Sequence, residues 1–155
     1  MTTYRDMFNF VIQGNLAGIE KALADGFNVN EKDRYGFLLI HRACANHQPE
    51  IVDLLVAHGS KLDETATDDW TPLHLAAVSG ALSCLQLLVQ AGANPNAQDK
   101  NGCTPLHLSI TSRDPKLARE LIRLGSDKGL RNNNGLTPLE LAKTKEAASF
   151  VTILS

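Results

Sequence analysis

The stretch TPLHLAAVSG at residues 71–80 decides the fold, because its opening returns twice along the chain. TPLH recurs at residues 104–107, and TPLE follows at residues 137–140, each 33 residues after the one before. Glycine keeps the same interval at four positions, Gly26, Gly59, Gly92 and Gly125. Two markers that hold one interval over most of a chain indicate a stack of similar units.

Each unit is predicted to contain two helices and a loop. Within residues 66–98, Thr71 can cap a helix N-terminus, and Pro72 fits the first turn because its missing N–H would be unpaired there. Glycine ends this helix, and apolar spacing predicts a second helix over about residues 82–90. The chain then runs to Asn101-Gly102, a pair typical of tight turns. Such a unit cannot bury its own apolar faces and must stack on its neighbours.

Composition bounds the function without specifying it. The 155 residues are 43% hydrophobic and 21% charged, which suits one globular domain. A net charge of −2 gives no reason to expect nucleic acid or a membrane as partner. The charge is uneven, with six Lys/Arg against twelve Asp/Glu in residues 1–99 (−6) and nine against five in residues 100–155 (+4). No apolar run approaches the roughly 20 residues that a spanning helix needs, and three cysteines fit a reduced cytoplasmic or nuclear protein.

These motifs identify a family resemblance. The chain resembles the ankyrin repeats, whose pattern is D-x-x-G-x-T-P-L-H-x-A-A-x-x-G, a second helix and then G-A-D/N-x-N. The resemblance implies an all-α solenoid of stacked helix-turn-helix units joined by β-hairpin loops, in one domain over residues 1–155. The expected units are residues 1–32, 33–65, 66–98, 99–131 and 132–155, of which the first and last are capping repeats.

Two departures from the pattern carry structural predictions. Leu38 stands where the pattern has threonine, so we expect the first helix of the second unit to be the least well capped. Asp69 stands where other units have a loop glycine. Aspartate tolerates the left-handed backbone better than most residues, so we expect Asp69 to adopt it at some cost.

Residues that could carry chemistry are more simply explained by structure. His41, His74 and His107 share one repeat position, so they should lie one repeat apart, too far to share a metal. The resemblance implies that they hydrogen-bond the backbone of adjacent loops. Phosphate loops, nucleophile elbows and zinc-protease helices are absent from the sequence. We therefore expect a non-enzyme with no catalytic, cofactor or metal site.

Cysteines and acidic residues leave alternatives open. Cys44 and Cys84 are predicted core residues, whereas Cys103 lies near a loop tip, where a reactive thiol is the minor alternative. Asp68 and Asp69 form either a solvated turn or an acidic contact for a basic partner segment.

The family resemblance implies a binding surface made of loop tips and first helices. Tyr35, Phe37 and Trp70 are three of only eight aromatic residues and fall on two adjacent tips. Phe37 and Trp70 should be neighbours, either contacting a partner or packing on each other. The predicted partner-binding residues are Arg34, Tyr35, Phe37, Asn46, Thr67, Asp68, Asp69, Trp70, Val78, Ser79, Lys100, Asn101, Cys103, Thr111 and Ser112.

The sequence therefore favours a non-catalytic protein-binding module, either an adaptor or a competitive inhibitor. We expect a monomer whose partner is another protein. The alternatives are a regulatory subunit of an enzyme and head-to-tail self-association of the acidic first part with the basic last part. Lys116, Arg119 and Arg123 form a second candidate surface, which is either a solvated outer face or a contact for an acidic partner.

Overall fold

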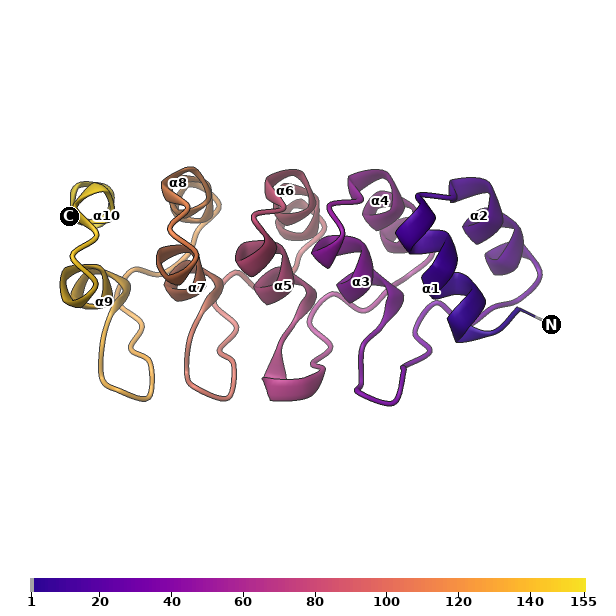
Figure 1. Cartoon of the computed structure of the whole chain (residues 1–155), viewed down its shortest axis with the longest axis horizontal. Coiled ribbons are helices and arrows are strands. Elements are labelled where there is room, and N and C mark those ends of the chain that lie inside the picture. Colours follow the sequence, from indigo (N-terminus) through magenta and orange to yellow (C-terminus); the bar gives the residue numbers. More distant parts are fainter. Residues whose placement is uncertain (1) are drawn as a thin grey trace.

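The computed structural model describes residues 2–155, which form five consecutive helix pairs (Figure 1). The pairs are α1 (Tyr4–Gln13) with α2 (Leu16–Ala24), α3 (Leu39–Ala45) with α4 (Pro49–Ala57), α5 (Pro72–Ser79) with α6 (Leu82–Gln90), α7 (Pro105–Thr111) with α8 (Pro115–Arg123), and α9 (Pro138–Thr144) with α10 (Ala148–Leu154). A short 3-10 turn, η1 (Thr67–Asp69), lies in the loop before α5. The expected all-α solenoid is confirmed.

The helices form two parallel rows (Figure 1). The first helices of the pairs, α1, α3, α5, α7 and α9, make the inner row, from which the loops project; the second helices make the outer row. Each helix packs against its own pair partner and against its counterpart in the adjacent pair. The surface formed by the inner row and the loop tips, called the inner surface below, therefore runs the length of the molecule.

Threonine and proline start most of the inner helices, as the sequence predicts. The Oγ1 atoms of Thr71, Thr104 and Thr137 each accept a hydrogen bond from the backbone N–H three residues later. Helix α3 has no such side-chain cap at Leu38, which confirms the prediction of a poorer cap. The Nδ1 atom of His41 accepts the Leu38 N–H at 3.1 Å, and His74 and His107 make the same bond at the starts of α5 and α7.

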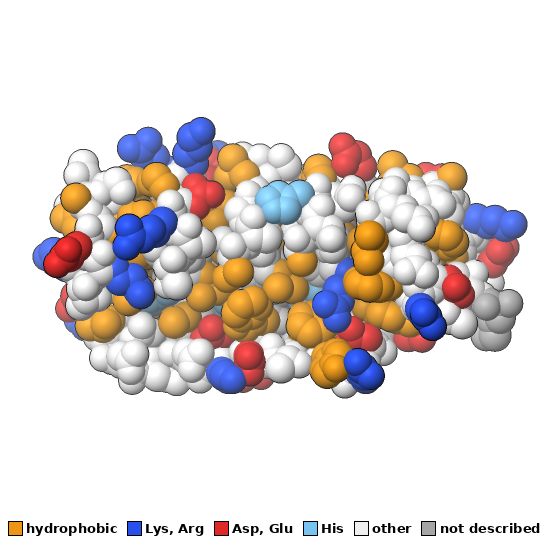
Figure 2. Space-filling model, viewed as in Figure 1, with side chains coloured by type: hydrophobic (Ala, Val, Ile, Leu, Met, Phe, Trp, Pro, Cys, Tyr) orange, Lys and Arg blue, Asp and Glu red, His pale blue; other side chains and the backbone are white. Residues whose placement is uncertain are grey.

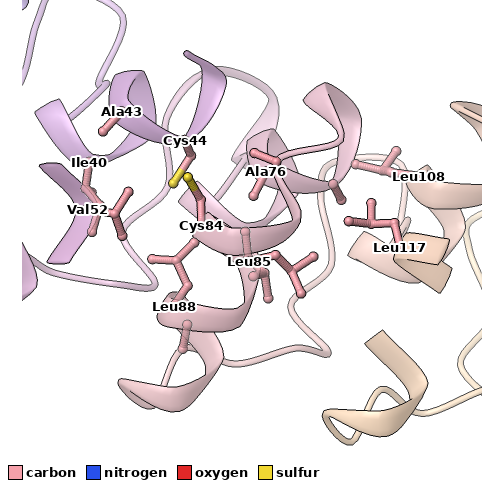
Figure 3. Packing of buried hydrophobic residues seen from close by; sticks show 14 of the residues in the cluster. Ile40, Ala43, Cys44, Val52, Ala76, Cys84, Leu85, Leu88, Leu108 and Leu117 are labelled. Carbon is pink, nitrogen blue, oxygen red and sulfur yellow. The ribbon is translucent and has the colours of Figure 1, made fainter. Parts of the chain in front are cut away.

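Small side chains let the inner helices approach one another. Ala43, Ala76, Ser109 and Ala142 are 33 residues apart in sequence and all are completely buried. The core between the rows is filled by larger side chains such as Leu85 and Leu88 of α6 (Figure 3). Truncation of a buried leucine to alanine typically costs about 2–5 kcal/mol, so this core dominates the stability.

The loops double back as expected, but their pairing is too short for β-strands. In each, the N–H of one residue donates to the carbonyl four residues later, as from Asp33 to Phe37 (3.0 Å) and from Asp99 to Cys103 (2.9 Å). Within residues 2–155 no strand forms, so the β-hairpin of the expectation is reduced to a closed turn. The reason is length, because the chain enters and leaves each turn within five residues.

Candidate protein-binding surface

Neighbouring loops are fastened to one another by backbone hydrogen bonds. Thr67 N–H donates to the Tyr35 carbonyl (3.1 Å), Lys100 N–H to the Asp68 carbonyl (3.0 Å), and Asn133 N–H to the Asn101 carbonyl (2.9 Å). Each bond joins one loop tip to the next. The tips are therefore positioned relative to one another before any partner arrives.

A histidine in each of α3, α5 and α7 anchors the loop that follows in the next repeat. The Nε2 atoms of His41, His74 and His107 lie 3.0–3.1 Å from the carbonyl oxygens of Trp70, Cys103 and Leu136 in the following loops. Each Nδ1 accepts a backbone N–H at its own helix start, so the proton sits on Nε2 and is donated to the carbonyl. Burial lowers the pKa of all three, that of His41 to about 4. The bracing role implied by the resemblance is confirmed.

The histidines are not assembled as a metal site. Their side chains follow one another along the stack, and in residues 2–155 no three His, Cys, Asp or Glu side chains converge as ligands would.

The aromatic residues of the tips divide into one exposed ring and two partly covered ones. Tyr35 is 52% exposed, and the Arg34 guanidinium lies 4.6 Å from its ring centroid. Phe37 packs edge-on against His41 (5.6 Å between centroids) and beneath Arg42 (4.1 Å). Of the two alternatives for Phe37 and Trp70, packing on each other is not what the described chain shows for Phe37, because His41 and Arg42 pack against its ring. Tyr35 is thus the accessible aromatic anchor.

The negative charge of the loop tip that carries Asp68 and Asp69 is partly neutralised. Asp68 forms an ion pair with Lys100 of the next loop, so two predicted contact residues hold each other. Asp69 is exposed and, among residues 2–155, forms no salt bridge. Its φ is +58°, which confirms the predicted left-handed backbone, and Asp68 shares it at +65°. Of these two aspartates, Asp69 is the one that offers an uncommitted carboxylate for a basic segment.

Hydroxyls predicted to face a partner are instead bonded to the protein. Ser79 Oγ donates to the carbonyls of Leu75 (2.8 Å) and Cys44 (3.2 Å), and Ser112 Oγ donates to the Leu108 carbonyl (3.0 Å). Thr111 Oγ1 donates weakly to the His107 carbonyl at 3.3 Å. These side chains fasten helices, so they contribute shape more than hydrogen bonds to the inner surface.

The remaining predicted residues lie where expected on the surface. Asn46, Thr67 and Asn101 are exposed, and Val78 is an exposed hydrophobic side chain at 41%. Cys103 is half-buried, and burial with the nearby Asp99 carboxylate raises the pKa of its thiol. A raised thiol pKa disfavours the thiolate, so the reactive Cys103 is not supported.

Sequence reasoning missed a hollow at the N-terminal end of the inner surface. Its volume is about 680 Å³, and its walls come from α1, the loop at residues 33–37 and α3. The lining residues are Tyr4, Arg5, Phe8, Asp33, Arg34, Tyr35 and Arg42. Helix α1 lacks the TPLH or TPLE box that marks α5, α7 and α9, but Phe8 precedes His41 by 33 residues. This 33-residue spacing was the feature of the sequence that could have placed Phe8 on an inner helix.

A cysteine pair was also missed. Cys44 of α3 and Cys84 of α6 are both buried, and their sulfur atoms point toward each other across adjacent pairs (Figure 3). Burial raises the pKa of the Cys44 thiol. Both cysteines are free thiols and fill the core, as predicted.

The basic side of α8 carries less net positive charge than its Lys and Arg residues alone indicate, because one arginine is paired with an acid. Arg123 forms a salt bridge with Glu120 (2.5 Å), which also accepts a hydrogen bond from Gln86 (2.8 Å). Lys116 and Arg119 remain exposed on the outer row, away from the loops. The exposure of these two side chains agrees with a solvated outer face. Because they lie away from the inner surface, they are suitable positions for control substitutions.

Across residues 2–155 no helix has the length and apolar character needed to cross a membrane.

Comparison with known proteins agrees with this architecture. A family model described as ankyrin repeats (3 copies) matches residues 7–99, and one described as ankyrin repeats (many copies) matches residues 88–142. An ankyrin repeat protein of fowlpox virus (strain NVSL) is 32% identical over 67 residues, which are 43% of this chain and 9% of that protein. The chain belongs to the ankyrin repeat family.

Proposed function

We propose that this chain is a non-catalytic adaptor or competitive inhibitor that binds another protein on its inner surface. Ankyrin repeats are in general protein–protein interaction modules, and the finer role is argued from this chain's own surface. One observation carries the proposal: the loop tips are tied to one another and to the inner helices by hydrogen bonds within the protein. A surface that is already ordered loses little conformational entropy on binding.

Exposed apolar groups supply the energy for such binding. Tyr35 on a tip and Val78 on α5 are among the few large hydrophobic side chains that are strongly exposed. Hydrophobic side chains gather along the middle of this face, over the inner helices (Figure 2). Truncation of an aromatic anchor at the centre of an interface typically costs about 2 kcal/mol or more.

Affinity capture with a surface variant tests the proposal. The wild-type chain is compared with a Tyr35→Ala/Val78→Ala double variant as bait, and with Lys116→Ala/Arg119→Ala as the matched control on the outer row. We expect a protein that the wild type and the control retain and that the inner-surface variant loses. Equal retention by all three baits would place binding elsewhere. Circular dichroism melting curves establish that each bait is folded.

The charge distribution favours one alternative, head-to-tail self-association. Residues 1–99 carry a balance of −6 and residues 100–155 a balance of +4, so the ends of two molecules attract. Sedimentation velocity at low and high salt separates this alternative from a monomeric module. A sedimentation coefficient that rises with protein concentration at low salt only would support self-association.

A further inference from the structure

We propose that the hollow at the N-terminal end of the inner surface binds an acidic side chain of a partner protein's segment, set beside an aromatic or aliphatic anchor. This inference rests on the proposed function and names the partner's chemistry at one end of the same surface. It differs from the prediction of a basic segment, which concerned Asp68 and Asp69 one repeat further along.

The lining of the hollow holds three arginines and one carboxylate, and two further acids lie close to it, Asp6 near Arg5 and Glu31 near Tyr4. Arg5 comes from α1, Arg34 from the loop tip and Arg42 from α3, whereas Asp33 is the acidic residue of the lining. Arg5 and Arg34 are exposed, and in the described chain neither forms a salt bridge. The guanidinium is the group best suited to bind carboxylates through paired hydrogen bonds.

Asp33 is fully engaged within the protein. Its Oδ1 accepts the backbone N–H groups of Tyr35 (2.8 Å) and Phe37 (2.9 Å), and its Oδ2 accepts Arg42 Nη2 (2.5 Å). It can therefore neutralise one arginine and no more. Among the lining side chains, Arg5 and Arg34 are therefore left without a carboxylate that is bonded to them.

Arg42 is held rigidly with donors to spare. Its guanidinium lies over the Phe37 ring at 4.1 Å and near the Phe8 ring at 5.4 Å. In the part of the chain that the structure describes, the Asp33 bond is the one hydrogen bond its side chain donates, and its buried Nε has no partner. A buried donor without an acceptor is costly. Because Nε is buried, an incoming carboxylate would meet the other N–H groups of this guanidinium, whose side chain is 27% exposed and donates to Asp33 alone in the described chain.

Tyr4 adds polarity without adding negative charge. Its hydroxyl donates to the Phe37 carbonyl at 3.0 Å. Burial and the nearby Asp33 carboxylate raise the pKa of Tyr4 to about 12, so the phenol stays neutral at physiological pH. The wall formed by α1 therefore does not repel an incoming carboxylate.

Apolar surface adjoins this charge at Tyr35, which is 52% exposed at the rim of the hollow. Ile12 on α1 and Val78 on α5 do not line the hollow, but they are exposed by 50% and 41% on inner helices. Basic side chains stand among the hydrophobic ones toward the N-terminal end of this face (Figure 2). A segment with an acidic residue next to an apolar one matches this order, whereas a basic residue in the hollow would meet three arginines.

Selection of peptides tests the inference directly. A phage library of short random peptides is selected on the wild-type chain, and binders are then sorted by their loss on an Arg5→Glu/Arg34→Glu variant. We expect the peptides lost on this variant to be enriched in Asp or Glu beside an aromatic or aliphatic residue. Replacing those acids by Asn or Gln should weaken Kd about tenfold, and added salt should weaken it further.

Controls keep the result interpretable. A Lys116→Glu/Arg119→Glu variant changes the net charge equally on the outer row and should retain these peptides. If the double variant fails to fold, Arg34→Gln alone replaces it, because Arg34 is exposed and its guanidinium lies over the Tyr35 ring. Binders that depend on Tyr35 and Val78 but carry no acidic preference would overturn this inference and leave the proposed function intact. Recovery of no inner-surface binder would contradict both.

Discussion

The loops at residues 66–70 and 99–103 occupy equivalent places in adjacent repeats, yet they turn by different means. In the second, Asp99 Oδ1 accepts the N–H groups of Asn101 (2.8 Å) and Cys103 (2.9 Å), and Gly102 takes the left-handed position. In the first, Ala66 has no such acceptor, and a 3-10 turn with two left-handed aspartates replaces it. Both close with the same 2.9 Å hydrogen bond across the turn.

This difference teaches that neighbours set the shape of a loop as much as its own sequence does. Each loop is bonded to the preceding tip and to the histidine of the preceding inner helix. The loop at 66–70 keeps the common form although it lacks both the local carboxylate and the glycine. Weakening or strengthening these supports one at a time should therefore change the stability of the fold by different amounts.

Acid should produce the largest effect, through the histidines that hold both loops. The pKa of His41 is about 4 in the folded chain, below the ordinary value of 6.5, so folding favours the neutral ring. This stability is complete above about pH 6.5 and is lost as the pH falls toward 4, by about 3 kcal/mol. Protonation would also place a hydrogen on Nδ1 against the Leu38 N–H.

Urea unfolding midpoints measured from neutral pH down to about pH 4 check this prediction. His41→Gln should flatten the pH dependence of the free energy of unfolding. An equally steep dependence in wild type and variant would show that other groups cause the acid sensitivity.

Gly102→Ala should cost about 2–3 kcal/mol. An added Cβ would lie 2.5 Å from Asn133 Oδ1 and 2.8 Å from Asn133 N, at a φ of +71°. Gly135→Ala is the matched control, because its φ is +74° and nothing lies within 4 Å of the added atom. The control should cost only about 1 kcal/mol, and equal losses in urea denaturation would contradict the role of the neighbouring loop.

Asp99→Ala should convert the second loop toward the first at a cost of about 1–2 kcal/mol, because two partly buried N–H groups lose their acceptor. The reciprocal change, Ala66→Asp, should raise the free energy of unfolding by up to about 1 kcal/mol. Thermal or urea unfolding measures both. No change in either would mean that the bonds between loops suffice.

Asp69→Gly should give the smallest effect, a gain of about 0.5 kcal/mol. Glycine removes the left-handed strain at φ +58° but makes the unfolded chain more flexible, and the two contributions largely offset each other. The melting temperature should rise slightly. A fall would show that the loss of the carboxylate and the flexibility of the unfolded chain outweigh the relief of backbone strain.

The sequence predicted those features that repeat at a fixed spacing. Helix starts at Thr71 and Thr104, the histidine bridges and the left-handed Asp69 all follow from the position of a residue within one unit. The hollow did not follow, because Phe8 and Arg42 meet across two repeats, one of which lacks the recognisable motif. Likewise, Cys44 and Cys84 occupy different repeat positions, so their contact depends on how the two rows are offset.

The directions in which side chains point were the second kind of feature that the sequence did not predict. Ser79 lies in α5 and Ser112 at the C-terminal end of α7, but their hydroxyls turn back to helix carbonyls. Phe37 was placed on a tip, but Arg42 covers it. A rotamer depends on competing partners nearby, which a single sequence does not display.

The bonds between loops have a further consequence for how the molecule opens. Each junction links only adjacent repeats, so the free energy of the whole behaves as a chain of nearest-neighbour couplings. The end repeats have one coupled neighbour and the central ones have two. Amide hydrogens of α10 should therefore exchange with solvent before those of α5 and α6, in a fraying that proceeds inward one repeat at a time.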